Sequence, residues 1–217
     1  MALAIFDLDE TLIDGDCASL WSAYMAKLGW VDGESFLKRD TELMALYSQG
    51  LLAMEDYMAF SLSPLVGRTA EEVAHVVEPY VEEVIEPLIY SDACKTLAQH
   101  RAAGDRLLVI SASGVHLVAP IAERLGVNEV LAIELDEEYG CYNGKTRGIL
   151  TYREGKVKRL QAWLTEQGES LDGAYFYSDS RNDLPLLTLV TQPRAVNPDP
   201  VLKAHAEHAG WPILHWR

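Results

Sequence analysis

The sequence is poor in cysteine, in positive charge and in long apolar runs. Its three cysteines, Cys17, Cys94 and Cys141, are odd in number and far apart, and they form neither a CxxC pair nor a Cys/His cluster. This pattern disfavours a zinc site and is typical of reduced thiols. Because reduced thiols persist in the cytosol, we expect a cytoplasmic protein.

Positive charge is scarce throughout the chain. The 18 Lys and Arg residues stand against 33 Asp and Glu residues, which gives a net charge of -15, and no basic run interrupts the acidic background. Such a surface repels nucleic acid and anionic membranes, so we expect neither as a partner. It also repels phosphate, so a phosphate site here requires a local cation or backbone N–H groups.

Long apolar runs are missing as well. The N-terminal run that ends at Phe6 is broken by Asp7 after about five residues, and no positively charged region precedes it, which disfavours an export signal. No segment approaches the roughly 20 apolar residues of a membrane-spanning helix. We also find no internal repeat and no low-complexity segment.

Hydrophobic residues make up 49% of the 217 positions, enough for one domain with a sizeable insertion or for two small domains. The pattern predicts a buried strand at residues 2–8 and a purely helical segment at 16–87, in which Thr69-Ala-Glu-Glu opens a helix as a capping box. From about residue 91 strands alternate with helices, and Asn143-Gly144 is predicted as a tight hairpin turn. This alternation predicts an α/β fold with a parallel sheet covered by helices on both faces.

Two carboxylates follow the first predicted strand. Asp7 and Asp9 are separated by one residue, so strand alternation sends both side chains toward the same side of the strand end. Two like charges at that distance raise one another's pKa unless a cation lies between them. The pair therefore predicts a bound divalent metal and carboxylate chemistry.

Three further features fall at predicted strand or helix ends on the same edge. Ser111-Ala-Ser-Gly114 follows a buried strand and leaves the N–H groups of the next helix free to bind an anion. Lys156, which opens a helix after Gly155, can supply a point charge to a phosphoryl group. The turn from Ser178 to Asp183 adds two carboxylates. Ligands in such sheets bind beyond the carboxyl ends of the strands.

Each feature alone has a plainer interpretation. Asp7 with Asp9, or Asp179 with Asp183, could cap the N-terminus of a helix. Ser111 on its own is typical of a turn. Lys156 on its own is typical of a solvated helix charge. Only the four features together, in this order, favour a single site.

The four motifs together resemble those of the haloacid dehalogenase superfamily. Asp-x-Asp-x-Thr at residues 7–11, then Ser111, Lys156 and an Asp-x-x-x-Asp turn at 179–183 follow the family order, and the resemblance covers essentially the whole chain. The helical insert resembles that of the phosphoserine-phosphatase-like branch (subfamily IB). The resemblance implies a Rossmann-like three-layer α/β/α core at 1–15 and 88–217, with a parallel sheet and a small all-helical cap at 16–87.

The resemblance also implies a phosphate monoester hydrolase that uses Mg²⁺. Asp7 resembles the nucleophile that forms an aspartyl-phosphate, and Asp9 resembles the general acid and base. Ser111, with Ala112 and Ser113, would bind the phosphoryl oxygens. Lys156 would neutralise the charge on the nucleophile and on phosphate, with Lys158 as its rival.

The metal ligands implied by the resemblance are oxygen atoms. Mg²⁺ would be bound by Asp7, by the backbone carbonyl of Asp9 and by Asp179, with Asp183 acting through water or as an orienting group. Two carboxylates completed by water and a phosphate oxygen are the coordination that Mg²⁺ prefers.

The substrate prediction depends on the helical insert. Asp16 stands where phosphoserine phosphatases use a carboxylate to hold the substrate amine, whereas the segment around Met58 and Ala59 lacks the arginine that holds the substrate carboxylate. A substrate with an amine, no carboxylate and an apolar body is therefore expected, with Met58 in contact, and histidinol phosphate fits this description. Arg39 or Arg68 could instead supply the missing arginine from another helix, and phosphoserine would then again be the expected substrate.

Two other functions remain open from the sequence. One is a phosphotransferase that passes the phosphoryl group to an acceptor other than water. The other, from a different class, is a catalytically idle module that binds phosphate or metal. The sequence carries no signal for an oligomeric state.

Overall fold

The computed structural model describes residues 2–217 and is built on one sheet. Within these residues seven strands follow the order β4-β3-β2-β1-β5-β6-β7. Neighbouring strands are parallel except β3 and β4, which are antiparallel. The strands are β1 (Leu3–Phe6), β2 (Arg106–Gly114), β3 (Glu129–Glu138), β4 (Cys141–Arg147), β5 (Tyr175–Ser178), β6 (Gln192–Val196) and β7 (Ile213–Leu214).

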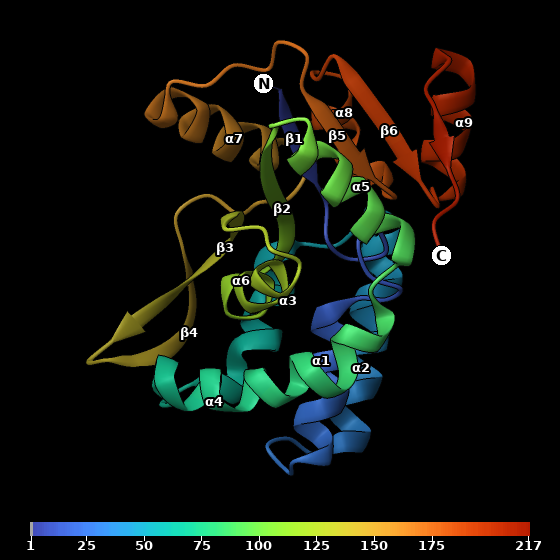
Figure 1. Ribbon diagram of the computed structural model, residues 1–217. Coiled ribbons are helices and arrows are strands. Elements are labelled where there is room, and N and C mark those ends of the chain that lie inside the picture. The colour runs from blue at the N-terminus through green and yellow to red at the C-terminus, as the bar shows by residue number, and fades with distance from the viewer. Residues whose placement is uncertain (1) are drawn as a thin grey trace.

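Helices cover both faces of the sheet, and the alternation of β1 shows why. Leu3 and Ile5 pack in one apolar cluster, whereas Ala4 and Phe6 pack in another on the opposite face. The Leu3 face is covered by α7 (Glu154–Gln167), α8 (Leu184–Leu187) and α9 (Pro200–Ala209), and the Phe6 face by α5 (Ser91–Ala102) and α6 (Val115–Arg124). The predicted α/β fold with a three-layer core and a mainly parallel sheet is confirmed (Figure 1).

The chain between β1 and β2 is helical. It contains α1 (Cys17–Lys27), α2 (Gly33–Ser48), α3 (Met54–Leu62), η1 (Ser63–Leu65), α4 (Ala70–Tyr80), a π turn η2 (Val81–Ile85) and η3 (Glu86–Leu88). The predicted capping box is present, because Thr69 Oγ1 accepts from the Glu72 amide at 3.1 Å while Glu72 Oε2 accepts from the Thr69 amide at 2.7 Å. Figure 1 shows these helices gathered below the sheet.

The prediction of a hairpin turn at Asn143-Gly144 is wrong. The β3–β4 hairpin turns instead at Tyr139 and Gly140, which both have positive φ, 54° and 78°. A two-residue turn of this kind needs positive φ at both positions. Gly144 lies inside β4, and Asn143 Oδ1 there accepts from the Lys145 amide at 2.9 Å.

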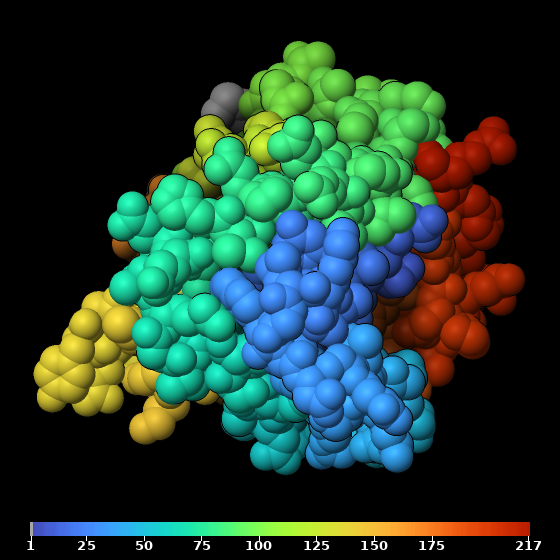
Figure 2. Space-filling model, turned by 90° about the horizontal axis from the view of Figure 1, so that it is seen from below, coloured from blue at the N-terminus to red at the C-terminus, as the bar shows by residue number. Residues whose placement is uncertain are grey.

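The hairpin also contacts the helical segment. The amide of Gly67 donates to the Tyr142 carbonyl and the amide of Tyr142 donates to the Arg68 carbonyl, both at 2.9 Å. Seen from below, the hairpin (yellow) projects beside the helical segment (blue to green), which spreads across this face (Figure 2). No helix within residues 2–217 is both long enough and apolar enough to cross a membrane.

Candidate active site

The strand order brings the first and last motifs to one edge of the sheet. Strand β1 lies between β2 and β5 and is parallel to both, so the residues that follow the three strands lie side by side. The amide of Asp7 donates to the Tyr177 carbonyl at 2.9 Å, which joins the end of β1 to the end of β5. Residues distant in sequence thus share one site.

Lys156 lies at the centre of a buried ion-pair network. Its Nζ is 2.9 Å from Asp7 Oδ1 and 2.8 Å from the Asp183 carboxylate, and its side chain is 3% exposed. Burial alone would lower the pKa of Lys156, but the charges of Asp183 and Asp7 outweigh burial and raise it, so the ammonium stays charged. Lys158, the other candidate for this role from the sequence, is exposed.

Asp9 is oriented by hydrogen bonds from α1 and from β2. Its Oδ1 accepts from the amide of Cys17, the first residue of α1, at 2.7 Å. Its Oδ2 accepts from the hydroxyls of Ser111 at 3.2 Å and Ser113 at 2.9 Å. The Asp9 side chain is therefore held between the start of the helical segment and the end of β2.

Thr11 is a site residue to which the sequence interpretation assigned no role. Its Oγ1 donates to Asp179 Oδ1 and accepts from the Asp179 amide, both at 3.0 Å. The loop after β1 and the loop after β5 are thereby fixed to each other. Because Thr11 belongs to the Asp-x-Asp-x-Thr motif, the motif itself was the signal that could have identified it.

These side chains surround a cavity of about 240 Å³. Its floor includes carboxylates from the loops after β1 and β5 and small residues from the last part of β2, namely Asp7, Asp9, Asp179, Ala112 and Ser113. Its opposite wall comes from the helical segment and is mixed acidic, aromatic and sulfur-containing, with Asp16, Met44, Tyr47, Met54 and Tyr57. Among the lining residues none is a lysine or an arginine. The cavity is therefore acidic, and the buried cation Lys156 pairs with Asp7 on its floor.

Three residues expected in contact with substrate do not line this cavity. Met58 is buried in the apolar core, and Met54 and Tyr57 on the same helix reach the cavity instead, because packing of α3 turns Met58 away. Ser111 is fully buried, and its Oγ contacts Asp9 and the Ser113 amide. Lys156 is likewise buried behind Asp7.

Neither arginine proposed as a substitute clamp reaches the cavity. Arg39 is about half exposed and pairs with Glu42 at 3.1 Å. The Arg68 guanidinium lies 3.7 Å from the centre of the Trp30 ring and donates to the Pro64 carbonyl. Neither residue lines the cavity. A carboxylate on the leaving group would thus meet no cation from this part of the wall.

Asp16 reaches the cavity while it caps α1. Its Oδ1 accepts from the Ser19 amide at 2.7 Å, the usual N-cap hydrogen bond. Removal from bulk water, together with the nearby charge of Asp9, raises the pKa of Asp16 to about 8. A cationic ligand beside Asp16 would reverse that shift.

The carboxylates at the strand ends are crowded. Burial raises the pKa of Asp7 to about 7, against the opposing effect of Lys156. Burial and the charges of Asp7 and Asp183 raise the pKa of Asp179 well above its usual value. Crowded, buried carboxylates of this kind become stable as anions when a cation joins them.

The donor set limits what kind of metal could bind. Within residues 2–217, no three His, Cys, Asp or Glu side chains form a metal-binding group. Asp183 is engaged by Lys156 and by Ser178 Oγ at 2.7 Å, which removes it from direct ligation. What remains is carboxylate and backbone oxygen, a donor set that suits a hard ion completing its shell with water and substrate.

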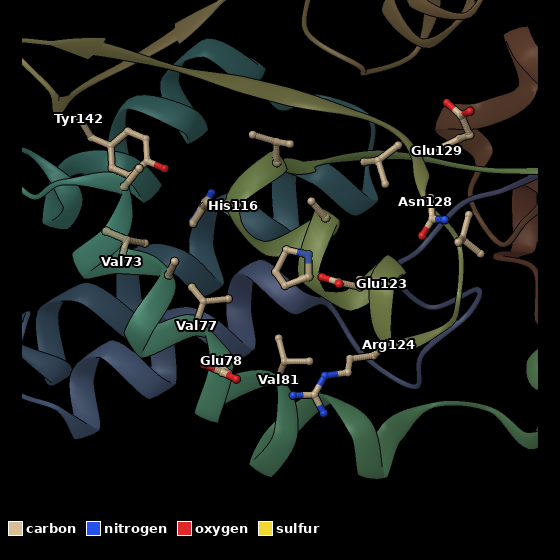
Figure 3. A pocket seen from close by; sticks show the side chains of 17 residues that line it. Val73, Val77, Glu78, Val81, His116, Glu123, Arg124, Asn128, Glu129 and Tyr142 are labelled. Atoms are coloured by element: carbon tan, nitrogen blue, oxygen red, sulfur yellow. The ribbon is translucent and has the colours of Figure 1, made fainter.

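A larger hollow lies elsewhere. A groove of about 950 Å³ runs between α4 and α6 and is lined by valines with a few charged side chains at its rim (Figure 3). None of Asp7, Asp9, Asp16 or Asp179 lines it. Size alone therefore does not locate the chemistry of this protein.

Comparison with known proteins agrees with this geometry. The family model of haloacid dehalogenase-like hydrolases matches residues 4–188. A histidinol-phosphatase of Neisseria meningitidis is 38% identical, with 99% of each chain covered. A phosphoserine phosphatase of Mycobacterium tuberculosis is 28% identical and matches all of this chain over 71% of its own length.

Solved structures share the fold. A Bordetella pertussis protein of unknown function is 36% identical, with a TM-score of 0.92 and 98% and 97% of the two chains covered. A substrate-bound phosphoserine phosphatase has a TM-score of 0.72 at 20% identity, with 98% and 92% covered. This chain belongs to the haloacid dehalogenase-like hydrolase family.

Proposed function

We propose that this protein is a Mg²⁺-dependent phosphatase that hydrolyses the phosphate monoester of a small amino alcohol through an aspartyl-phosphate on Asp7. Family membership makes it a hydrolase, and its phosphatase-named relatives make it a phosphoric monoester hydrolase. The observation that carries the proposal is the Asp7–Lys156–Asp183 network at the edge of an acidic cavity.

The first chemical step uses Asp7 and Asp9. A carboxylate oxygen of Asp7 attacks phosphorus, and the bond to the leaving alcohol breaks as Asp9 protonates the departing oxygen. Lys156 holds Asp7 Oδ1, which fixes the rotamer of the nucleophile. The hydroxyls of Ser111 and Ser113 hold Asp9 Oδ2 beside the cavity.

The second step returns the enzyme to its starting state. Asp9 takes a proton from water, the water oxygen attacks phosphorus, and the Asp7 carboxylate leaves as inorganic phosphate forms. Asp7, the Asp9 carbonyl and Asp179 would hold Mg²⁺, which when bound offsets the repulsion between Asp7 and the anionic substrate. Thr11 keeps Asp179 in place for that role.

The composition of the cavity supports an amine-bearing leaving group. Asp16 offers a carboxylate, while Tyr47, Tyr57 and the two methionines offer an apolar and aromatic surface. A leaving group with its own carboxylate would lose its hydration without gaining a cationic partner, at a cost of several kcal/mol. The 38% identity to a histidinol-phosphatase supports L-histidinol phosphate as the substrate, and the phosphoserine phosphatase relatives make phosphoserine its main competitor.

We also propose the division of the chain into a core at 1–15 and 88–217 and a helical cap at 16–87. The helical segment supports this division, because its first helix, α1, begins at Cys17 and its last, η3, ends at Leu88. A cytoplasmic location is supported by the three free cysteines.

A phosphate-release assay tests the proposal. The purified protein with Mg²⁺ is compared on L-histidinol phosphate, phosphoserine, phosphocholine and a sugar phosphate. We expect the highest kcat/KM on L-histidinol phosphate. Faster hydrolysis of phosphoserine would contradict the argument from the missing cation. Transfer of phosphate to added alcohols in preference to water would make the protein a phosphotransferase.

A further inference from the structure

We propose that the hydroxyl of Tyr57 determines substrate specificity by accepting a hydrogen bond from the leaving group's ammonium, beside the carboxylate of Asp16. This inference rests on the proposed function and adds a residue that the motifs do not contain. Tyr57 lies on α3, and Asp16 precedes α1, so two separate helices would form one subsite.

The first observation is an unpaired polar atom. The Tyr57 side chain is buried, yet within residues 2–217 its hydroxyl oxygen has no hydrogen-bond partner. An unpaired buried hydroxyl costs about 1–3 kcal/mol, and a phenylalanine would avoid that cost with the same ring packing. A hydroxyl kept at such a place indicates a partner that arrives with the ligand.

The second observation is the location of that hydroxyl-bearing side chain. Tyr57 lines the same cavity as Asp16 and the strand-end carboxylates. Burial and the charges of Asp16 and Asp40 hold the pKa of Tyr57 well above its usual value, so the phenol stays neutral and can accept a hydrogen bond. An ammonium has three N–H donors, and one carboxylate cannot accept all of them in one geometry.

Asp16 is pre-positioned for a shared role. The Ser19 amide occupies Oδ1, and among residues 2–217 Oδ2 makes no hydrogen bond. Asp16 would supply the charge, and Tyr57 would supply a neutral acceptor that fixes the direction of the amine. An amine-free ester would leave both groups unpaired and gain nothing from either.

The plainer alternative is that Tyr57 only packs the core. Tyr142 is a matched comparison, because it is also buried and lies in the groove between α4 and α6, outside the cavity. If packing alone mattered, Tyr57→Phe and Tyr142→Phe would behave alike toward all substrates.

Two measurements test the inference. The first compares kcat/KM of wild type, Y57F and Y142F on L-histidinol phosphate and on the analogue that lacks the amine. For Y57F we expect a loss of about tenfold on the amine ester, mainly in KM, and less than about twofold on the analogue. Y142F should leave the ratio between the two esters unchanged. An equal change on both esters for Y57F would overturn the proposal.

The second measurement is binding of free L-histidinol and its amine-free analogue to the wild type and Y57F by calorimetry. Y57F should weaken only the amine-bearing ligand. This readout does not depend on hydrolysis, so it judges Tyr57 even if the phosphatase assay contradicts the proposed substrate. If Y57F does not fold, a D16N variant, which retains the helix cap, is compared on the same ligand pair. Equal loss for both ligands would again overturn the subsite.

Discussion

The strand-end edge and the helical wall of the cavity differ in how completely their polar groups are paired. At the edge, Lys156 forms ion pairs with two carboxylates, and Thr11 makes two hydrogen bonds with Asp179. On the wall, the Tyr57 hydroxyl has no partner within residues 2–217, and two methionines, which adapt their shape easily, line the same cavity. The polar groups at the edge are therefore fixed before a ligand binds, whereas the wall has polar groups that a bound ligand could pair.

We expect the largest effect from a substitution of the proposed nucleophile at the strand-end edge. Asp7→Asn should lower kcat by about 10⁴-fold or more, because the amide cannot form the acyl-phosphate bond. Phosphate release measures this loss, and circular dichroism checks that the fold survives. Substantial residual turnover would remove Asp7 as the nucleophile.

Metal removal probes the same edge without a substitution. Dialysis against EDTA should abolish phosphate release, and added Mg²⁺ should restore it, because the crowded carboxylates need a cation to bind an anionic substrate. Mg²⁺ should also raise the melting temperature of the wild type more than that of Asp179→Asn. Full activity in EDTA would rule out metal dependence.

Lys156→Met tests how much stability the edge derives from pairing. Removing the ammonium leaves Asp7 and Asp183 buried without their cation, so the free energy of unfolding should fall by about 3–5 kcal/mol. The exposed neighbour provides the control, since Lys158→Met should change stability by less than about 0.5 kcal/mol. Chemical denaturation measures both, and equal losses would contradict the buried network.

On the wall, Asp16→Asn should cost about 10- to 100-fold in kcat/KM on the amine ester while sparing the helix cap. The pH dependence sharpens this prediction. Asp16 has a pKa raised to about 8, so it is largely protonated below that pH in the empty cavity. The KM for the amine ester should therefore rise as pH falls below 8 in the wild type. In the variant this Asp16-dependent part of the rise should vanish.

Much of the edge could be predicted from the sequence. The apolar runs before Asp7, Ser111 and Asp179 mark strands whose ends meet in a parallel sheet, and the structure brings the three strand ends together, although β2 continues through Ser111 to Gly114. The hairpin turn could not be placed, because Asn143-Gly144 is a strong local turn signal and the competing positive-φ pair at Tyr139-Gly140 is set by pairing between β3 and β4. Tertiary pairing overrode the local preference.

The sequence alone determined the order of the chemical groups along the chain and the edge of the sheet at which they meet, because strand alternation and parallel connections follow from local pattern. Only the tertiary structure decided that Lys156 is buried and Lys158 exposed. It also decided that Tyr57, and not Met58, lines the cavity. The physical reason is that neighbouring positions on a helix point about 100° apart, so which one meets a ligand depends on how the helix is rotated when it packs.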